Sequence, residues 1–129
     1  MNAFTLDGVA YKVRIPENGI KRSGQILDGE NAGRGQSGVM VRDVIGTYFN
    51  YTIELDTSVL DVAEYDRLYE AITSPVDSHT LKIPYAQTTL TFQAYITKAE
   101  DTLRSMTGGV NHWTGLTMSF VAMEPQRTP

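Results

Sequence analysis

The segment Arg22–Asp56, RSGQILDGENAGRGQSGVMVRDVIGTYFNYTIELD, joins a glycine-rich polar loop directly to the longest strand-like run of the chain. Glycines stand at positions 24, 29, 33, 35 and 38, among polar residues that offer no periodic apolar face. A loop of this length is uncommon in a small domain, and it is usually either functional or mobile until a partner binds. The sequence therefore predicts a loop or arm over about residues 21–43.

The second part of this segment, Val44 to Asp56, alternates in the manner of a half-buried strand. Val39, Met40 and Val41 extend its apolar character backward, so loop and strand are expected to form one long arm. Gly46 is expected to mark a bulge or a bend. The predicted core face consists of the odd positions Ile45, Thr47, Phe49, Tyr51, Ile53 and Leu55.

The composition fits a single domain over residues 1–129, with 41% hydrophobic and 20% charged residues. A net charge of −4 and a pI near 5.0 argue against a nucleic-acid or anionic-membrane surface. The absence of cysteine removes disulfides, thiolate zinc sites and cysteine nucleophiles. No 18-residue apolar window and no basic, apolar leader occur, so we expect a soluble protein made in the cytoplasm without a signal peptide.

The remaining segments read mainly as strands. Asp7-Gly8 between two alternating runs predicts a hairpin of residues 4–6 and 9–15. Further strands are expected over residues 81–85, 90–96 and 113–123, whereas 100–106 fits either a helical turn or a strand. The residues after position 123 are expected to form a short, loose tail.

One helix is predicted over about residues 61–73. Asp61 begins a capping-box pattern with Glu64, and Ser74-Pro75 ends the run. The apolar stripe expected to pack on the sheet consists of Val62, Tyr65, Leu68, Tyr69 and Ile72. The summed pattern predicts a mainly β fold: an antiparallel β-sandwich or partly closed barrel, with one flanking α-helix and a long glycine-rich loop.

Chemical motifs are weak in this sequence. Gly33–Gly38, GRGQSG, matches the dinucleotide fingerprint, but it leads into a strand and not a helix. Asp66 and Glu70 share a helical face, which is more typical of a solvated surface than of an acid/base pair. His79 and His112 lack metal-ligand spacing, and no hydrolase motif occurs. We expect no catalytic residue, no cofactor and no metal.

Several phrases of the sequence resemble prophage-encoded proteins of siphophage tail gene clusters in Gram-positive hosts. The resemblance covers nearly the whole chain, and its motifs are structural. It implies a tail-tube-like fold, as in tail tube, distal tail and baseplate hub proteins, with a long loop that packs against neighbouring subunits in a ring. The phrases are Arg22-Ser23, Leu27-Asp28-Gly29-Glu30-Asn31-Ala32-Gly33-Arg34, Gly38-x-Met40-x-Arg42-Asp43-Val44-Ile45-Gly46-Thr47-Tyr48, Glu64-Tyr65-Asp66, Leu68-Tyr69, Ser74-Pro75-Val76 and Trp113-x-x-Leu116-x-Met118-x-Phe120.

The leading hypothesis is therefore a non-enzymatic virion tail protein of a phage or prophage. It would assemble with its own copies into a ring, or dock onto neighbouring tail proteins, through the arm. The apolar anchors predicted for the neighbour are Ile26, Leu27, Val39, Met40 and Val41, and the arginines predicted to pair with its acidic groups are Arg22, Arg34 and Arg42.

Two alternatives from other classes stay open. A monomeric β-sandwich module that binds a carbohydrate or protein ligand would use Trp113 and exposed tyrosines. An enzyme or nucleotide-binding protein would use the loop from Gly33 to Gly38. Neither a membrane nor a specific nucleic-acid sequence is expected as a partner.

Overall fold

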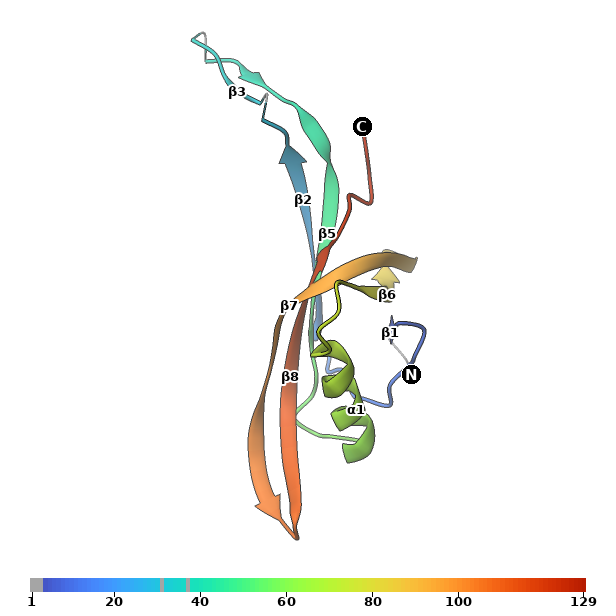
Figure 1. Ribbon diagram of the computed structural model, residues 1–129. Helices are drawn as coiled ribbons and strands as arrows, with labels where there is room; N and C mark the ends of the chain where they lie inside the picture. Colours follow the sequence, from blue (N-terminus) through green and yellow to red (C-terminus); the bar gives the residue numbers. More distant parts are fainter. Residues whose placement is uncertain (1–3, 31, 37) are drawn as a thin grey trace.

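The fold is known from a computed structural model, which describes residues 4–30, 32–36 and 38–129. It is mainly β with one helix, as predicted (Figure 1). The elements are β1 (Thr5–Leu6), β2 (Ile20–Asp28), β3 (Gly33–Arg34), β4 (Met40–Val41), β5 (Val44–Glu54), α1 (Val62–Ile72), β6 (His79–Tyr85), β7 (Thr88–Thr107) and β8 (Val110–Ala122).

Six strands form one sheet in the order β1-β6-β7-β8-β5-β2, and every neighbouring pair is antiparallel. β3 and β4 form a separate two-stranded ladder. The edges β1 and β2 do not pair with each other, so the described chain does not close into a barrel. The fold is β-sandwich-like, which agrees with the first of the two predicted architectures.

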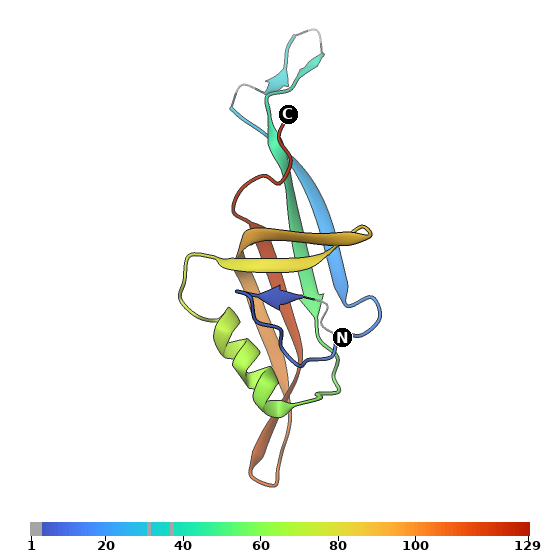
Figure 2. The ribbon, with the colours of Figure 1, turned by 90° about the vertical axis from the view of Figure 1, so that its right-hand side faces the viewer.

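Strand β7 folds this single sheet into two layers. Its first part, Thr88–Ala94, pairs with β6, and its later part, from Ala94 to Thr107, pairs with β8. Register shifts interrupt the β7–β8 ladder at three points, and such bulges bend and twist a strand. Figure 2 shows β6 and the start of β7 crossing over the layer of β8, β5 and β2.

The core lies between these layers and α1. Strand alternation supplies most of it, because every second side chain of β8 and of the inner half of β5 points inward. The fully buried side chains include Leu6, Tyr51, Ile53, Leu68, Leu81, Ile83, Leu116, Met118 and Phe120.

Helix α1 begins and ends where the sequence predicts. The Asp61 carboxylate caps the first turn, accepting hydrogen bonds from the backbone N–H groups of Ala63 (3.0 Å) and Glu64 (3.3 Å). Tyr65, Leu68 and Ile72 of the predicted stripe are buried. Tyr69, by contrast, is exposed.

The N-terminal hairpin is only half formed. Asp7 and Gly8 adopt the positive φ angles of the predicted turn, 52° and 81°. However, Leu6 and Val9 make only an isolated bridge, and the segment predicted as the second strand, 9–15, is not a strand. β1 pairs with β6 instead. Tyr11, Val13 and Ile15 of this segment pack against the core, whereas Val9 is exposed.

The segment expected to be irregular from Lys21 begins as a regular strand. β2 runs over nine residues and pairs with β5 from Ile20↔Ile53 to Leu27↔Gly46. A register shift between Leu27 and Asp28 places a bulge beside Gly46, where the sequence predicted one. Sequence periodicity did not find β2 because most of its side chains are exposed on both faces.

The C-terminal segment is not loose, contrary to the prediction. It lies along the outer half of β5, beyond the point where β8 ends (Figure 1). Thr47 N donates to Arg127 O at 2.8 Å, and Gln126 N donates to Thr47 O at 2.9 Å. The Gln126 side chain also accepts from Phe49 N at 2.7 Å. The outer half of β5 thus has a partner on each side.

Two hairpins project from the body in opposite directions (Figures 1 and 2). One is the arm, which ends in the ladder of β3 and β4. The other, here called the distal hairpin, is the outer part of β7 and β8 over residues 100–114, which turns at Gly108 and Gly109 with φ angles of 64° and 75°. The ambiguous residues 100–106 are therefore part of a strand.

Candidate assembly site on the arm

The arm is an extended double strand. Its base is the outer part of the β2–β5 ladder, where Ile26 and Leu27 pair with Thr47 and Gly46, and the described residues of its tip, within 29–43, carry two cross-strand pairs, Gly33↔Val41 and Arg34↔Met40. Gly29 N donates to Asp43 O at 2.6 Å where the tip begins, and Gly38 N donates to Gly35 O at 3.0 Å near its end. Each backbone connection is local, so the tip has no tertiary support from the body among the described residues.

The predicted apolar anchors lie on the surface of this arm. Val39, Val41 and Ile26 are exposed to 63%, 57% and 57%, and Met40 is also exposed. Only Leu27 is half-buried. Val44 and Ile45, at the start of β5, add two further exposed side chains, so the outer half of the predicted core face does not reach the core. Among the described residues of the arm, 21–47, none belongs to the buried hydrophobic core.

The three predicted arginines differ in their surroundings. Arg22 lies near the body, where its guanidinium is 5.3 Å from the centre of the Tyr85 ring. Arg42 pairs with Asp28 inside the arm, with Nε at 2.8 Å from Oδ1. Arg34 donates from Nη1 to the neutral carbonyl of Gly38 at 2.9 Å. Of the three, Arg34 is the one at the tip without a carboxylate partner among the described residues.

A second region, which contains Trp113 of the binding-module alternative, lies at the other end of the molecule. A cleft of about 590 Å³ separates α1 from the distal hairpin, and we call it the α1 cleft. Its apolar lining includes Trp113 and Tyr69, exposed to 39% and 37%. The available signal was the apolar residue Val110 directly after the Gly108-Gly109 turn, which extends the final strand beyond Trp113.

The α1 cleft is acidic. Asp66, Glu70 and Asp101 line it, and no lysine or arginine does so. Asp66 and Glu70 are exposed on α1, as expected of a solvated helical face. Asp101 accepts a hydrogen bond from the Tyr65 hydroxyl at 3.0 Å, which ties the helix to β7. Burial and this hydrogen bond raise the pKa of Tyr65 well above its ordinary value of 10.0, so the hydroxyl stays protonated.

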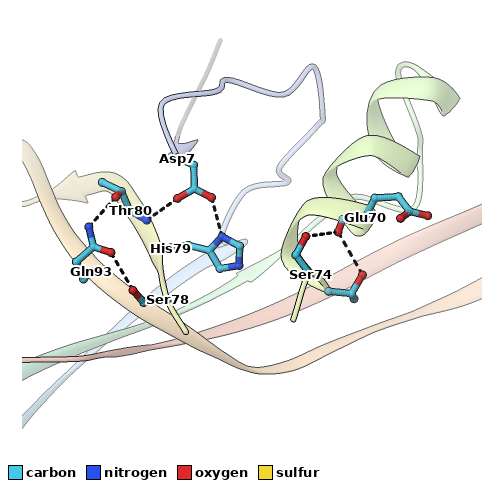
Figure 3. A network of polar contacts seen from close by, with 8 residues as sticks. Asp7, Glu70, Ser74, Ser78, His79, Thr80 and Gln93 are labelled. Carbon is cyan, nitrogen blue, oxygen red and sulfur yellow. Dashed lines mark hydrogen bonds and ion pairs between the residues drawn. The ribbon is translucent and has the colours of Figure 1, made fainter. Parts of the chain in front are cut away.

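The two histidines do different things. His79 is buried, and its Nδ1 lies 2.7 Å from Asp7 Oδ2, while Asp7 Oδ1 accepts from Thr80 N at 2.8 Å (Figure 3). An ionised carboxylate only accepts, so Nδ1 carries the proton. This contact holds the N-terminal turn on β6. His112 stands on β8 in the distal hairpin.

Gly33 and Arg34 form β3, and Gly35 and Gly38 follow in the arm tip before β4. A dinucleotide site needs a strand before such a segment and a helix after it, and here a strand follows. Over residues 4–30, 32–36 and 38–129, no group of three or more acidic or histidine side chains is arranged to hold a metal ion. The single helix described is too short to cross a membrane.

Comparison of the sequence with models of known protein families and with curated proteins produced no match.

Proposed function

We propose that this chain is a non-enzymatic structural subunit of a phage or prophage tail, which assembles with its own copies or docks onto neighbouring tail proteins through the arm. The observation that carries the proposal is an extended double strand that contributes nothing to the core and exposes Ile26, Val39, Met40 and Val41. Exposed apolar surface on a protruding element is typical of a surface that a partner covers.

The conformational entropy of the arm tip also favours assembly through the arm. Ordering a backbone residue costs roughly 1–2 kcal/mol, and the two cross-strand pairs of the tip offset little of that cost. Contacts from a partner would supply the difference, so the tip becomes fixed on assembly. The tail itself, and a tube, distal or baseplate position within it, follow from the sequence resemblance described above.

The test is size-exclusion chromatography with light scattering over a concentration series. The intact chain is compared with a variant in which residues 24–40 are replaced by a short Gly-Ser linker. We expect ring-sized or tube-sized species of the intact chain that the variant does not form. Val76→Ser is the matched control, because Val76 is an equally exposed apolar side chain outside the arm, at 55%.

A monomer of the intact chain at every concentration would contradict self-assembly. The phage-tail part is tested separately by mass spectrometry of tailed particles from the source strain, where the chain should be a stoichiometric component. Its absence from such particles would contradict a tail position.

A second candidate function, a monomeric binding module, is favoured by the α1 cleft, where Trp113 and Tyr69 lie beside three carboxylates. Aromatic faces with neighbouring hydrogen-bond acceptors suit a saccharide. Trp113 is the one tryptophan of the chain, and it lines this cleft, so its fluorescence reports on binding there. An emission shift on adding an oligosaccharide, at constant monomer mass, would favour the binding module.

A further inference from the structure

We infer that the α1 cleft is the receptor for the arm tip of a second copy of this chain. The inference rests on the proposed function. It identifies the surface of the neighbouring copy to which the arm binds, which the proposed function leaves open. The observations that carry it are the surface chemistry of the two ends of the molecule and their positions relative to each other.

The arm tip presents a cation beside an apolar side chain. Arg34 and Met40 stand directly opposite each other in the β3–β4 ladder, so both side chains project from the same face. Both are exposed. The guanidinium uses one of its donors on Gly38 O, which leaves further donors for an acceptor outside the arm.

The α1 cleft presents the complementary pair. Trp113 and Tyr69 give it aromatic surface, and thioether side chains such as that of Met40 pack favourably on aromatic rings. Asp66 and Glu70 lie beside them on α1 and form no ion pair among the described residues. Asp66 also lines a neighbouring cleft that contains Arg104, whereas no lysine or arginine lines the α1 cleft, where Glu70 lies. A guanidinium pairs strongly with carboxylates in such a cleft.

The arm cannot reach the α1 cleft of its own chain. Both ribbon views place the arm tip and the distal hairpin at opposite ends of the long axis, with the body between them (Figures 1 and 2). The occupant is therefore a second copy. Because the arm and the cleft are different surfaces, each copy offers one of each, and successive copies extend the assembly or close it into a ring.

The inference is tested with two variants that change only exposed side chains. The arm variant carries Arg34→Glu and Met40→Ser, and the cleft variant carries Asp66→Arg and Glu70→Arg. Each variant alone should assemble at least about tenfold more weakly than the intact chain, because each meets like charge across the contact. Lys82→Glu, a charge reversal at an exposed residue of β6, is the control and should behave as the intact chain.

Mixing the two variants is the decisive measurement. The cleft variant keeps an intact arm, and the arm variant keeps an intact cleft, so an equimolar mixture should form complexes that contain both variants in equal number and that neither variant forms alone, by light scattering. Trp113 emission should move to shorter wavelength in that mixture, and in the intact chain as its concentration rises. Circular dichroism of each variant checks that the fold is kept.

The outcomes separate the inference from the function on which it rests. Assembly of the intact chain with unchanged Trp113 emission, or a mixture that stays monomeric, would overturn the cleft as receptor and leave arm-dependent assembly standing. An intact chain that stays monomeric throughout would overturn the inference and self-assembly, and docking onto neighbouring tail proteins would then rest on the analysis of tailed particles. Complexes that contain both variants in equal number, with the emission shift, support both.

Discussion

Asp7 and His79 are the clearest case of a contact made between single residues far apart in sequence. They are separated by 72 positions, yet their side chains meet at 2.7 Å. Partial burial acts to raise the pKa of Asp7, but the hydrogen bonds from His79 and Thr80 N outweigh it, and the pKa falls below 3.8. Folding therefore favours the ionised carboxylate.

We predict that Asp7→Asn lowers the free energy of unfolding by about 1 kcal/mol at pH 6, a figure reduced for the partial exposure of the carboxylate. Asparagine also tolerates the positive φ of this turn, so the backbone is kept. Because the pKa of Asp7 is lowered on folding, its contribution is present above pH 3.8 and disappears as pH falls through the lower folded value. The difference between the two proteins should therefore shrink below pH 3.8.

Urea unfolding at pH 6 and pH 3 measures this difference. Asp77→Asn is the matched control, since Asp77 is an exposed aspartate between α1 and β6. A difference between Asp7→Asn and the intact chain that is equal at both pH values would contradict the role of the carboxylate charge.

At the scale of elements, the outer half of β5 is held between β2 and the C-terminal segment. The C-terminal segment packs closely on β5 at Gly46, because a Cβ built there would lie 2.5 Å from Arg127 O and 2.6 Å from the Pro125 Cβ. Gly24 of β2 is different, since its nearest neighbour would be a Phe49 ring atom at 3.5 Å. Glycine is thus required by packing at position 46 and not at position 24.

We predict that Gly46→Ala destabilises the protein by roughly 1–3 kcal/mol, the usual cost of overpacking, or displaces the C-terminal segment. Gly24→Ala is the control and should leave stability within roughly 1 kcal/mol of the intact chain. Thermal unfolding of both variants measures the effect. The same substitution in a chain shortened after Met123 should cost little, and an undiminished cost there would contradict a clash with the C-terminal segment.

At the scale of the whole molecule, the hydrophobic core belongs to the body and not to the arm. The buried hydrophobic side chains come from β1, β5 to β8, α1 and their flanking residues, and none comes from the described residues between 7 and 50. Tyr48 and Phe49, which pack partly against the core, lie on β5 and not in the arm. The arm therefore serves the surface of the molecule and not its interior.

We predict that replacing residues 24–40 by a Gly-Ser linker lowers the free energy of unfolding by no more than about 2 kcal/mol, because exposed side chains contribute little. Leu81→Ala, at a fully buried side chain of β6, should cost roughly 2–5 kcal/mol by comparison. Urea unfolding of dilute protein measures both. A linker variant that fails to fold would show that the arm belongs to the folding unit.

The sequence by itself determined the features that depend on neighbours along the chain. Asp61 caps α1 because its carboxylate reaches N–H groups two and three residues away. The alternation of β8 and of the inner half of β5 identified their buried faces, since side chains of a strand point to opposite sides in turn. Asp7-Gly8 marked its turn through the backbone conformation that it favours.

Only the tertiary structure decided which elements pair and which surfaces remain open. β2 is a strand because its backbone completes the edge beside β5, an interaction that needs no apolar pattern in its side chains. The C-terminal segment is held on β5 by hydrogen bonds to the backbone of Thr47 and Phe49, which likewise need no apolar pattern. The α1 cleft combines side chains from α1, β7 and β8, so no local sequence pattern predicts it. Periodicity and capping are local properties of a chain, whereas pairing and burial depend on residues that only folding brings together.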